Sequence, residues 1–116
     1  MKRDWDTIRR IMGKVEALPD SVSYLGCDAV DGLDTDACAY HMQLMIEAGL
    51  AVGTVVGMNQ YVRLQRLTWA GHELLDSIRK DTVWNKIKEI ARVKGVDLGI
   101  DAVRAIAALV LAQVLG

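Results

Sequence analysis

Residues 66–76 read RLTWAGHELLD, and residues 81–86 read DTVWNK. Thr68 and Asp81 belong to the residue types that favour helix N-caps, and each precedes a run with helical apolar spacing. The first run follows β-forming residues directly. This part of the sequence therefore predicts a strand that enters one capped helix, which a second capped helix follows closely.

Two tryptophans lie just inside these two helices, which we expect over residues 68–80 and 81–94. Aromatic residues make up 5% of the chain and Phe is absent. Large aromatic side chains in such a chain usually anchor the core, so we predict that Trp69 and Trp84 are buried. Gly71 is expected where the first helix packs closely on a neighbouring main chain, since a side chain would collide there.

Apolar residues at helical spacing predict a helix over residues 4–17. Weak alternation over residues 21–26 predicts a short strand. Asp34 or Thr35 should begin a further helix, and Gly49 should supply the left-handed residue that ends it. The stripe that we expect this helix to bury consists of Ala37, Tyr40, His41, Leu44 and Ala48.

β-forming residues on both sides of Gly57-Met58-Asn59 predict a hairpin formed by residues 50–56 and 60–67. A last helix is expected from Gly99 to Leu115. The predicted fold class is mainly α with a small β-hairpin (α+β). We expect residues 1–94 to form a winged-helix-like domain, extended by a C-terminal helical segment over residues 95–116 that serves dimerisation or core packing.

Length and charge limit the classes of protein that the chain can represent. A chain of 116 residues fits one domain with a single core. The formal net charge is -1, so no global basic field is present. No Lys or Arg occurs from Val15 to Val62. The same segment carries seven acidic residues: Glu16, Asp20, Asp28, Asp31, Asp34, Asp36 and Glu47.

The expected location is the cytoplasm, which is the host cytoplasm if a phage encodes the protein. The first residues are polar, unlike the apolar core of a signal peptide, and two cysteines in such a chain indicate a reducing compartment. The apolar stretch over residues 105–115 is well short of the roughly 20 residues that a membrane span needs. We therefore expect no membrane association.

Three segments of the chain resemble one protein family. Residues 66–79 follow the pattern RLTW-GH-LLD-IR, and residues 81–89 follow DT-W-K-KE. Residues 40–50 follow YH--LL-EAGL except at Met45, where the pattern has Leu. The chain resembles a family of small phage and prophage proteins that is catalogued as domain of unknown function 2513. This resemblance implies a phage or prophage origin, a winged-helix-like fold and no known catalytic activity. It assigns a role to no individual residue.

The helix that begins at Asp34 resembles the recognition helix of winged-helix regulators, but its charges are unsuited to DNA. A DNA-reading helix normally exposes Arg, Lys, Asn or Gln to bases and phosphates. Carboxylates without a nearby cation would repel the phosphate backbone. The simplest interpretation is a core helix with a solvated acidic face. If this face binds a partner, we expect a protein with a basic surface, bound through Asp34, Asp36, Gln43 and Glu47.

The alternative is DNA binding by the other, more basic parts of the chain. In that case the hairpin would act as a wing, and the helix over residues 81–94 would supply further phosphate contacts. The predicted contacts of this alternative are Arg63, Arg66, Lys86, Arg92 and Lys94.

No residue pattern in the chain predicts catalysis, a cofactor or a metal ion. Cys38 and His41 are three residues apart on a predicted helix, whereas Cys27 and His72 are isolated, and zinc sites usually contain two closely spaced ligand pairs. We expect both histidines to be structural, with hydrogen bonds to the main chain or a carboxylate. We expect no enzyme.

The C-terminal helix is apolar around much of its circumference, so nearly all of its sides require cover. One side can pack on its own chain, and a second copy in a symmetric dimer would cover another. The alternative is a central position in a small bundle of its own. The predicted dimer interface comprises Ile106, Leu109, Val110, Leu111, Val114 and Leu115.

These observations lead to one principal functional hypothesis. We expect a small, dimeric phage accessory protein that binds a host or phage protein, for instance to modulate host transcription or defence. The alternative hypothesis is a winged-helix transcriptional regulator that binds DNA.

Overall fold

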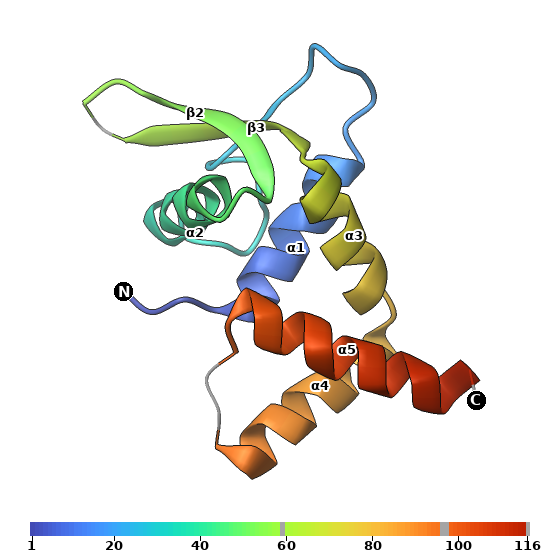
Figure 1. Ribbon diagram of the computed structural model, residues 1–116. Helices are drawn as coiled ribbons and strands as arrows, with labels where there is room; N and C mark the ends of the chain where they lie inside the picture. Colours follow the sequence, from blue (N-terminus) through green and yellow to red (C-terminus); the bar gives the residue numbers. More distant parts are fainter. Residues whose placement is uncertain (59, 96–97, 116) are drawn as a thin grey trace. The chain divides into compact units, whose positions relative to one another are not determined.

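The structure, a computed structural model, contains five helices and a three-stranded antiparallel sheet in the residues that it describes, 1–58, 60–95 and 98–115 (Figure 1). Side chains are described up to residue 113. The α+β class is thereby confirmed. In chain order the elements are α1 (Trp5–Glu16), β1 (Leu25–Gly26), α2 (Thr35–Glu47), β2 (Ala51–Val56), β3 (Tyr61–Leu67), α3 (Trp69–Ile78), α4 (Asp81–Lys94) and α5 (Ile100–Leu115).

The chain divides into two compact units, which we call the N-terminal unit (Met1–His72) and the C-terminal unit (Glu73–Gly116). The N-terminal unit contains α1, α2, the sheet and the first turn of α3. The C-terminal unit contains the remainder of α3 with α4 and α5. This division lies within α3. The assignment of residues 1–94 to a winged-helix-like domain, with residues 95–116 as an element of the same domain, stays a prediction.

Helix α1 begins and ends close to the predicted positions. The side chain of Asp4 accepts a hydrogen bond from the main-chain N–H of Asp6 at 3.0 Å and so caps the first turn. The apolar stripe of the helix is buried and packs against β3 and α2 in the core of the N-terminal unit. Its members are Trp5, Ile8, Ile11, Met12 and Val15.

The sheet has the strand order β1-β3-β2. The predicted strand over residues 21–26 is reduced to Leu25–Gly26. A turn centred on Asp20 accounts for the difference, because Oδ1 of Asp20 accepts hydrogen bonds from the main-chain N–H groups of Val22 and Ser23 at 3.0 and 2.7 Å. Such side-chain acceptors compete with strand pairing.

Strands β2 and β3 form the predicted hairpin, with Val56 opposite Tyr61 at its tip. The register shifts between Val52 and Gly53, so Gln65 is the extra residue on β3. Val62 and Leu64 of β3 are buried beneath the sheet against α1 and α2. Near the tip of the hairpin, the side chains of Val55, Val56 and Met58 are exposed.

Helix α2 begins after Asp34, whose carboxylate accepts a hydrogen bond from the main-chain N–H of Ala37 at 3.1 Å. Gly49 follows the helix with φ +72°, as predicted for a left-handed C-terminal residue. The predicted buried stripe is wrong by about one residue, and it shares only His41 with the observed one. The buried residues are Cys38, Ala39, His41, Met42 and Met45. Since α2 is apolar on most sides, the sequence did not determine which side faces the core.

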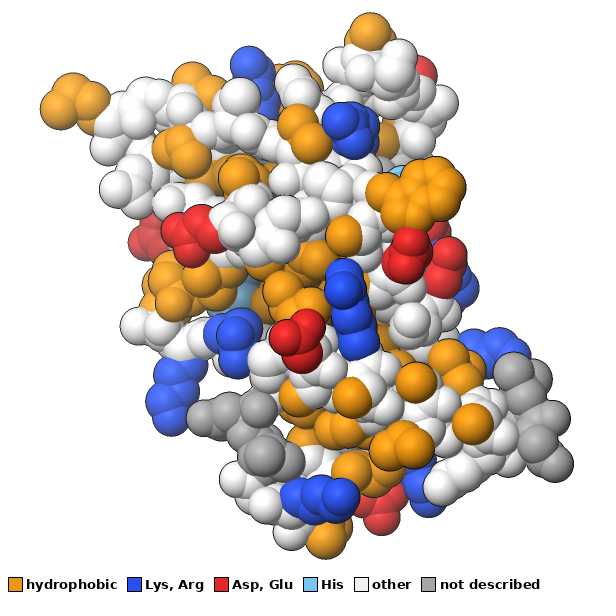
Figure 2. All heavy atoms as spheres, in the orientation of Figure 1, with side chains coloured by type: hydrophobic (Ala, Val, Ile, Leu, Met, Phe, Trp, Pro, Cys, Tyr) orange, Lys and Arg blue, Asp and Glu red, His pale blue; other side chains and the backbone are white. Residues whose placement is uncertain are grey.

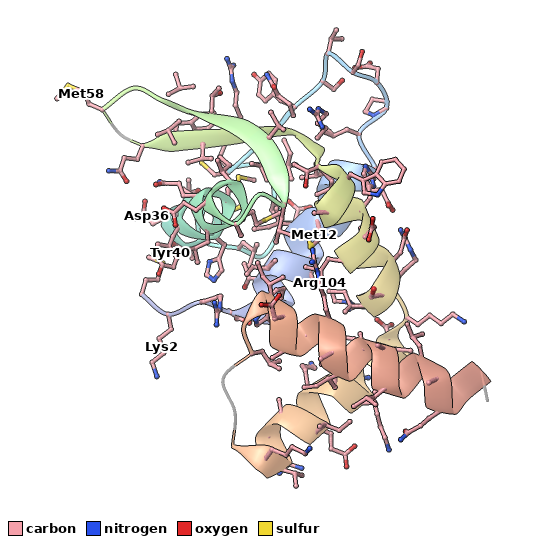
Figure 3. All side chains as sticks on the ribbon, viewed as in Figure 1. Lys2, Met12, Asp36, Tyr40, Met58 and Arg104 are labelled. Atoms are coloured by element: carbon pink, nitrogen blue, oxygen red, sulfur yellow. The ribbon has the colours of Figure 1, made fainter. Side chains whose placement is uncertain are left out.

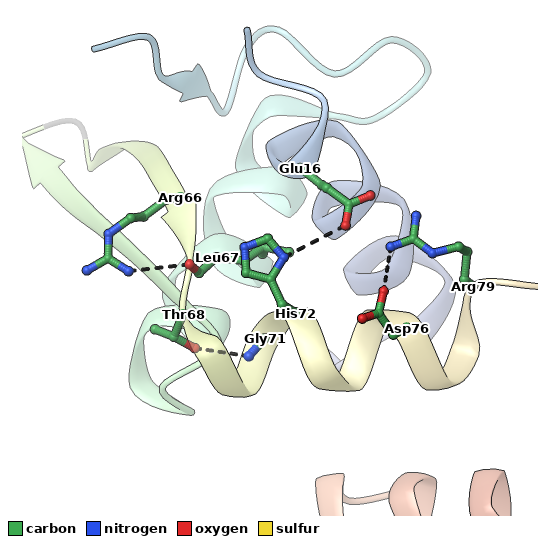
Figure 4. A network of polar contacts seen from close by, with 8 residues as sticks. All are labelled: Glu16, Arg66, Leu67, Thr68, Gly71, His72, Asp76 and Arg79. Atoms are coloured by element: carbon green, nitrogen blue, oxygen red, sulfur yellow. Dashed lines mark hydrogen bonds and ion pairs between the residues drawn. The ribbon is translucent and has the colours of Figure 1, made fainter. Parts of the chain in front are cut away.

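The passage from β3 into α3 is fixed by main-chain contacts. Oγ1 of Thr68 accepts a hydrogen bond from the N–H of Gly71 at 3.0 Å (Figure 4), which confirms the predicted cap. The same hydroxyl donates a hydrogen bond to the carbonyl of Gly49 at 2.5 Å. A Cβ atom at Gly71 would collide with the main-chain carbonyl of Leu50. The prediction of close packing at Gly71 is therefore confirmed.

The two tryptophans differ in burial. Trp84 is 1% exposed, as predicted, whereas Trp69 is 82% exposed, so the prediction of a buried Trp69 is wrong. The buried side of α3 includes Gly71, Leu74 and Ile78. At about 100° per residue, Trp69 lies roughly 200° from Gly71 and faces away from that side.

In the C-terminal unit, α4 packs against α5. Lys80 occupies the N-cap position of α4 without a side-chain cap hydrogen bond in the described structure, so the prediction of Asp81 as the cap is wrong by one residue. Gly95 ends the helix in the left-handed conformation, as expected. In the described part of the chain, no helix combines the length and apolar character that crossing a membrane requires.

Candidate interaction site between α2 and the hairpin tip

An open groove of about 440 Å³ lies in the N-terminal unit between α2 and the tip of the hairpin. Figure 3 labels Asp36 and Tyr40 on α2, and Met58 at the end of the hairpin. The residues that line the groove are Met1, Asp36, Ala39, Tyr40, Gln43, Met58 and Gln60. They come from three segments that are far apart in the sequence.

A buried histidine joins two of these segments. Nε2 of His41 accepts a hydrogen bond from the main-chain N–H of Asp4 at 2.9 Å, and Nδ1 lies 2.7 Å from the carbonyl of Ala37. These contacts fix the tautomer that carries its proton on Nδ1. They also hold the N-terminal segment against α2, which explains why Met1 reaches the groove. The prediction of a structural role is confirmed for His41.

The groove combines one acid with apolar and neutral polar groups. The carboxylate of Asp36 is exposed in the first turn of α2, and Met58 is fully exposed in the turn between the strands. Among the described residues that line the groove, Asp36 alone carries a charged side chain. An acidic group and a flexible apolar side chain in one groove suit a partner that presents both a cation and an aliphatic surface.

The predicted protein-binding residues have different positions. Asp36 and Gln43 line the groove together. The carboxylate of Asp34 caps α2 instead, and Glu47 is exposed at the C-terminal end of α2, outside the lining. The sequence analysis missed Met58 as a binding residue, although an exposed methionine between two turn-forming residues was a usable signal.

The predicted DNA contacts are divided between the two units. On β3, the guanidinium of Arg63 lies 4.8 Å from the ring centroid of Tyr24, and its Nε donates to Thr54 Oγ1 at 3.4 Å. Arg66 donates to the carbonyl of Leu67 at 3.4 Å (Figure 4). The remaining three residues, Lys86, Arg92 and Lys94, are exposed on α4 in the C-terminal unit.

The predicted dimer residues lie on different sides of α5. Val110 is buried with Val103 and Ala107, whereas Leu109 is 65% exposed. Ile106 and Leu111 are half-buried, and the side chains of Val114 and Leu115 lie outside the described residues. Figure 2 shows hydrophobic side chains along α5 on the face that it draws.

The two cysteines are buried, whereas the second histidine, His72, is exposed near a carboxylate. Cys27 and Cys38 are buried free thiols. Burial raises the pKa of the Cys38 thiol to about 11, with smaller contributions from Cys27 and Asp28. Nδ1 of His72 lies 3.8 Å from Oε2 of Glu16 (Figure 4). In the part of the chain that the structure describes, no group of three or more His, Cys, Asp or Glu side chains is arranged to hold a metal ion.

The fold and the groove define the chain as a small α+β protein with an acidic and apolar groove in its N-terminal unit. A family model described as "Hypothetical protein (DUF2513)" matches residues 2–97, so the chain belongs to this family. It is also 40% identical, over 117 residues, to an "Uncharacterized protein" of Haemophilus influenzae, with 99% of each chain covered. No solved structure gives a significant match.

Proposed function

We propose that this protein is a winged-helix-like accessory protein of phage or prophage type that binds another protein through the groove between α2 and the hairpin tip. The observation that carries the proposal is the position of the Asp36 carboxylate and the exposed Met58 side chain in one groove. The partner would present a basic and aliphatic surface, since electrostatic complementarity governs specificity and association rate.

The order of the elements supports the winged-helix part of this proposal. A helix, a short strand, a second helix and a hairpin follow one another, and α2 leads directly into the hairpin through Gly49. This is the order in which winged-helix proteins place a recognition helix before a wing. The exposed hairpin tip would then act as the wing. The phage or prophage origin depends on the resemblance of the three sequence segments alone.

The charges on α2 favour a protein partner over DNA. The exposed residues at the two ends of this helix include Asp36 and Glu47, and the segment from Val15 to Val62 contains no Lys or Arg. DNA binding gains most of its non-specific affinity from cations that neutralise phosphates. An α2 that faced a DNA groove would place carboxylates there instead.

The test is capture of partners from a bacterial lysate by immobilised wild-type protein and by two groove variants, with quantitative mass spectrometry as the readout. Asp36→Lys reverses the charge in the groove, and Met58→Asp removes its exposed apolar group. Both should reduce capture of the same proteins by about tenfold or more, as expected when a central contact is lost.

Matched controls separate the groove from general surface effects. Glu47→Lys is the control for Asp36→Lys, since it reverses a charge on α2 outside the groove. Val93→Asp is the control for Met58→Asp, since it replaces an exposed apolar side chain on α4 by the same acid. Both controls should retain the captured proteins. Equal losses in the groove and control variants would contradict the proposal.

DNA binding is the second candidate, and the observation that favours it is the position of Arg63 and Arg66 on one strand of the hairpin. Titration of labelled duplex DNA at two salt concentrations tests it. Tight binding that Arg63→Ala with Arg66→Ala weakens, with a smaller salt dependence, would establish this alternative. Loss of sequence-selective binding on changing Gln43 would show that α2 reads a groove.

A homodimer through α5 is a further part of the proposal. The 65% exposure of Leu109 supports it, since Leu109 lies on a different side of α5 from buried Val110. Leu109→Glu should break the α5 contact if this side holds a second copy, because burying an unpaired charge is costly. Sedimentation velocity of the wild type and the variant gives the answer, and a wild type that is already monomeric would contradict the dimer.

A further inference from the structure

Strand β2 is an edge strand without the usual protection against pairing. In the sheet that the described residues form, β3 is its neighbour on one side, and its other side faces no strand. The strand reads AVGTVV and contains neither charge nor proline. Val55 and Val56 are 50% and 43% exposed. Soluble proteins usually place lysine, proline or cover on such edges, because an open edge invites another strand.

Hydrogen bonds on the opposite side of β3 show which groups of β2 face this open edge. The main-chain N–H of Cys27 donates to the carbonyl of Val62 at 2.9 Å, so the main chain of Val62 is directed toward β1. Val62 is paired with Val55, which makes this pair non-hydrogen-bonded in the β2–β3 ladder. The N–H and C=O of Val55 therefore point away from β3. Main-chain groups two residues apart on a strand point to the same side, so the N–H and C=O of Gly53 also point away from β3.

We propose that two copies of this chain pair through β2, antiparallel, about a twofold axis at Thr54. In this register Gly53 of each copy lies opposite Val55 of the other, and four main-chain hydrogen bonds form between the groups that face the open edge. Thr54 lies opposite Thr54 of the second copy. The two three-stranded sheets would then form one continuous sheet.

Side-chain pairing and charge favour a second copy as the occupant. The register places Val52 opposite Val56 of the second copy on the same face as the threonine pair, and β-branched pairs of this kind stabilise antiparallel strands. No like charges meet across the axis. The nearest cation is Arg63 on β3, opposite Thr54. Three strand spacings of about 4.8 Å each separate it from Arg63 of the second copy, roughly 14 Å, which exceeds the Debye length of about 8–10 Å.

Two charge variants at the axis provide the test. Thr54→Lys and Thr54→Glu each place like charges opposite one another, so each variant alone should dimerise about tenfold or more weakly than the wild type. Mixing the two variants should restore a dimer, because opposite charges then meet at the axis. Sedimentation velocity gives the dissociation constants, and native mass spectrometry identifies the mixed dimer by its mass.

A second variant tests the main-chain hydrogen bonds. Val55→Pro removes an N–H that faces the open edge and leaves the β2–β3 ladder intact, so it should weaken the dimer without preventing folding.

The control for the charge variants is Gln65→Lys. It adds the same charge as Thr54→Lys, but at an exposed position of β3 away from the β2 edge. Circular dichroism of every variant should match that of the wild type.

Each remaining outcome overturns the proposal. A wild type that stays monomeric at the highest soluble concentration shows that the edge does not bind a second copy. A dimer that persists at wild-type affinity in Thr54→Lys and Thr54→Glu, and that Leu109→Glu dissociates, places the contact on α5 instead. Failure of the mixed variants to associate, when each alone is weakened, excludes the twofold register at Thr54.

Discussion

The first turns of α3 and α4 each contain a tryptophan but are stabilised in different ways. In α3, the Thr68 side chain caps the first turn and Gly71 lies against the main chain of Leu50, while Trp69 is 82% exposed. In α4, the N-cap side chain forms no cap hydrogen bond in the described structure, while Trp84 is 1% exposed. Trp69 is the first residue of α3 and faces away from its buried side, whereas Trp84 is the fourth residue of α4 and lies on its buried side. The comparison shows that the burial of a tryptophan near a helix start depends on the side of the helix that it occupies.

Trp84→Ala should have the largest effect on this comparison. Removal of a buried indole leaves a cavity and should lower the free energy of unfolding by about 3–5 kcal/mol. Urea denaturation followed by circular dichroism measures the change. A shift of the midpoint no larger than that caused by Trp69→Ala would contradict the burial of Trp84.

Gly71→Ala should have the next largest effect, although it adds only one methyl group. The new Cβ atom would collide with the carbonyl of Leu50, so the main chain must move, at a cost of roughly 1–3 kcal/mol or more. The control is Ala70→Gly, which removes one methyl group at the neighbouring position of α3. A stable Gly71→Ala variant would show that β2 and α3 can separate easily at this point.

Thr68→Ala should lower the free energy of unfolding by about 1 kcal/mol, because it removes a helix cap. It also removes the hydrogen bond to the carbonyl of Gly49. Thr68→Ser keeps the hydroxyl and should recover most of the loss. Thermal denaturation of the three proteins measures the difference, and equal midpoints would show that the cap contributes nothing measurable.

Trp69→Ala should have the smallest effect on folding, within about 0.5 kcal/mol, because surface substitutions rarely exceed that value. The same variant also tests a binding role, since an exposed tryptophan can anchor a partner. Loss of partner capture with unchanged stability would add Trp69 to the interaction surface. A large loss of stability would show that its ring packs in the folded protein.

The groove could be predicted only in part. The acidic face of α2 and the turn at Gly57 were visible in the sequence, so Asp36, Gln43 and the hairpin were predicted. The inclusion of Met1 was not, because it depends on the hydrogen bond between Asp4 and buried His41, which are 37 positions apart. Contacts at such separation leave no periodic signal in one sequence.

The sequence by itself determined where the helices and the hairpin begin and end. Caps, glycines and apolar spacing act within a few residues, and they gave the bounds of the five helices and the two hairpin strands to within about two residues. Tertiary structure alone decided which side of α2 is buried, that Trp69 faces outward, and that β2 lies at the edge of the sheet. Each of these depends on which surface packs against which, and α2 is apolar on too many sides for local sequence to choose.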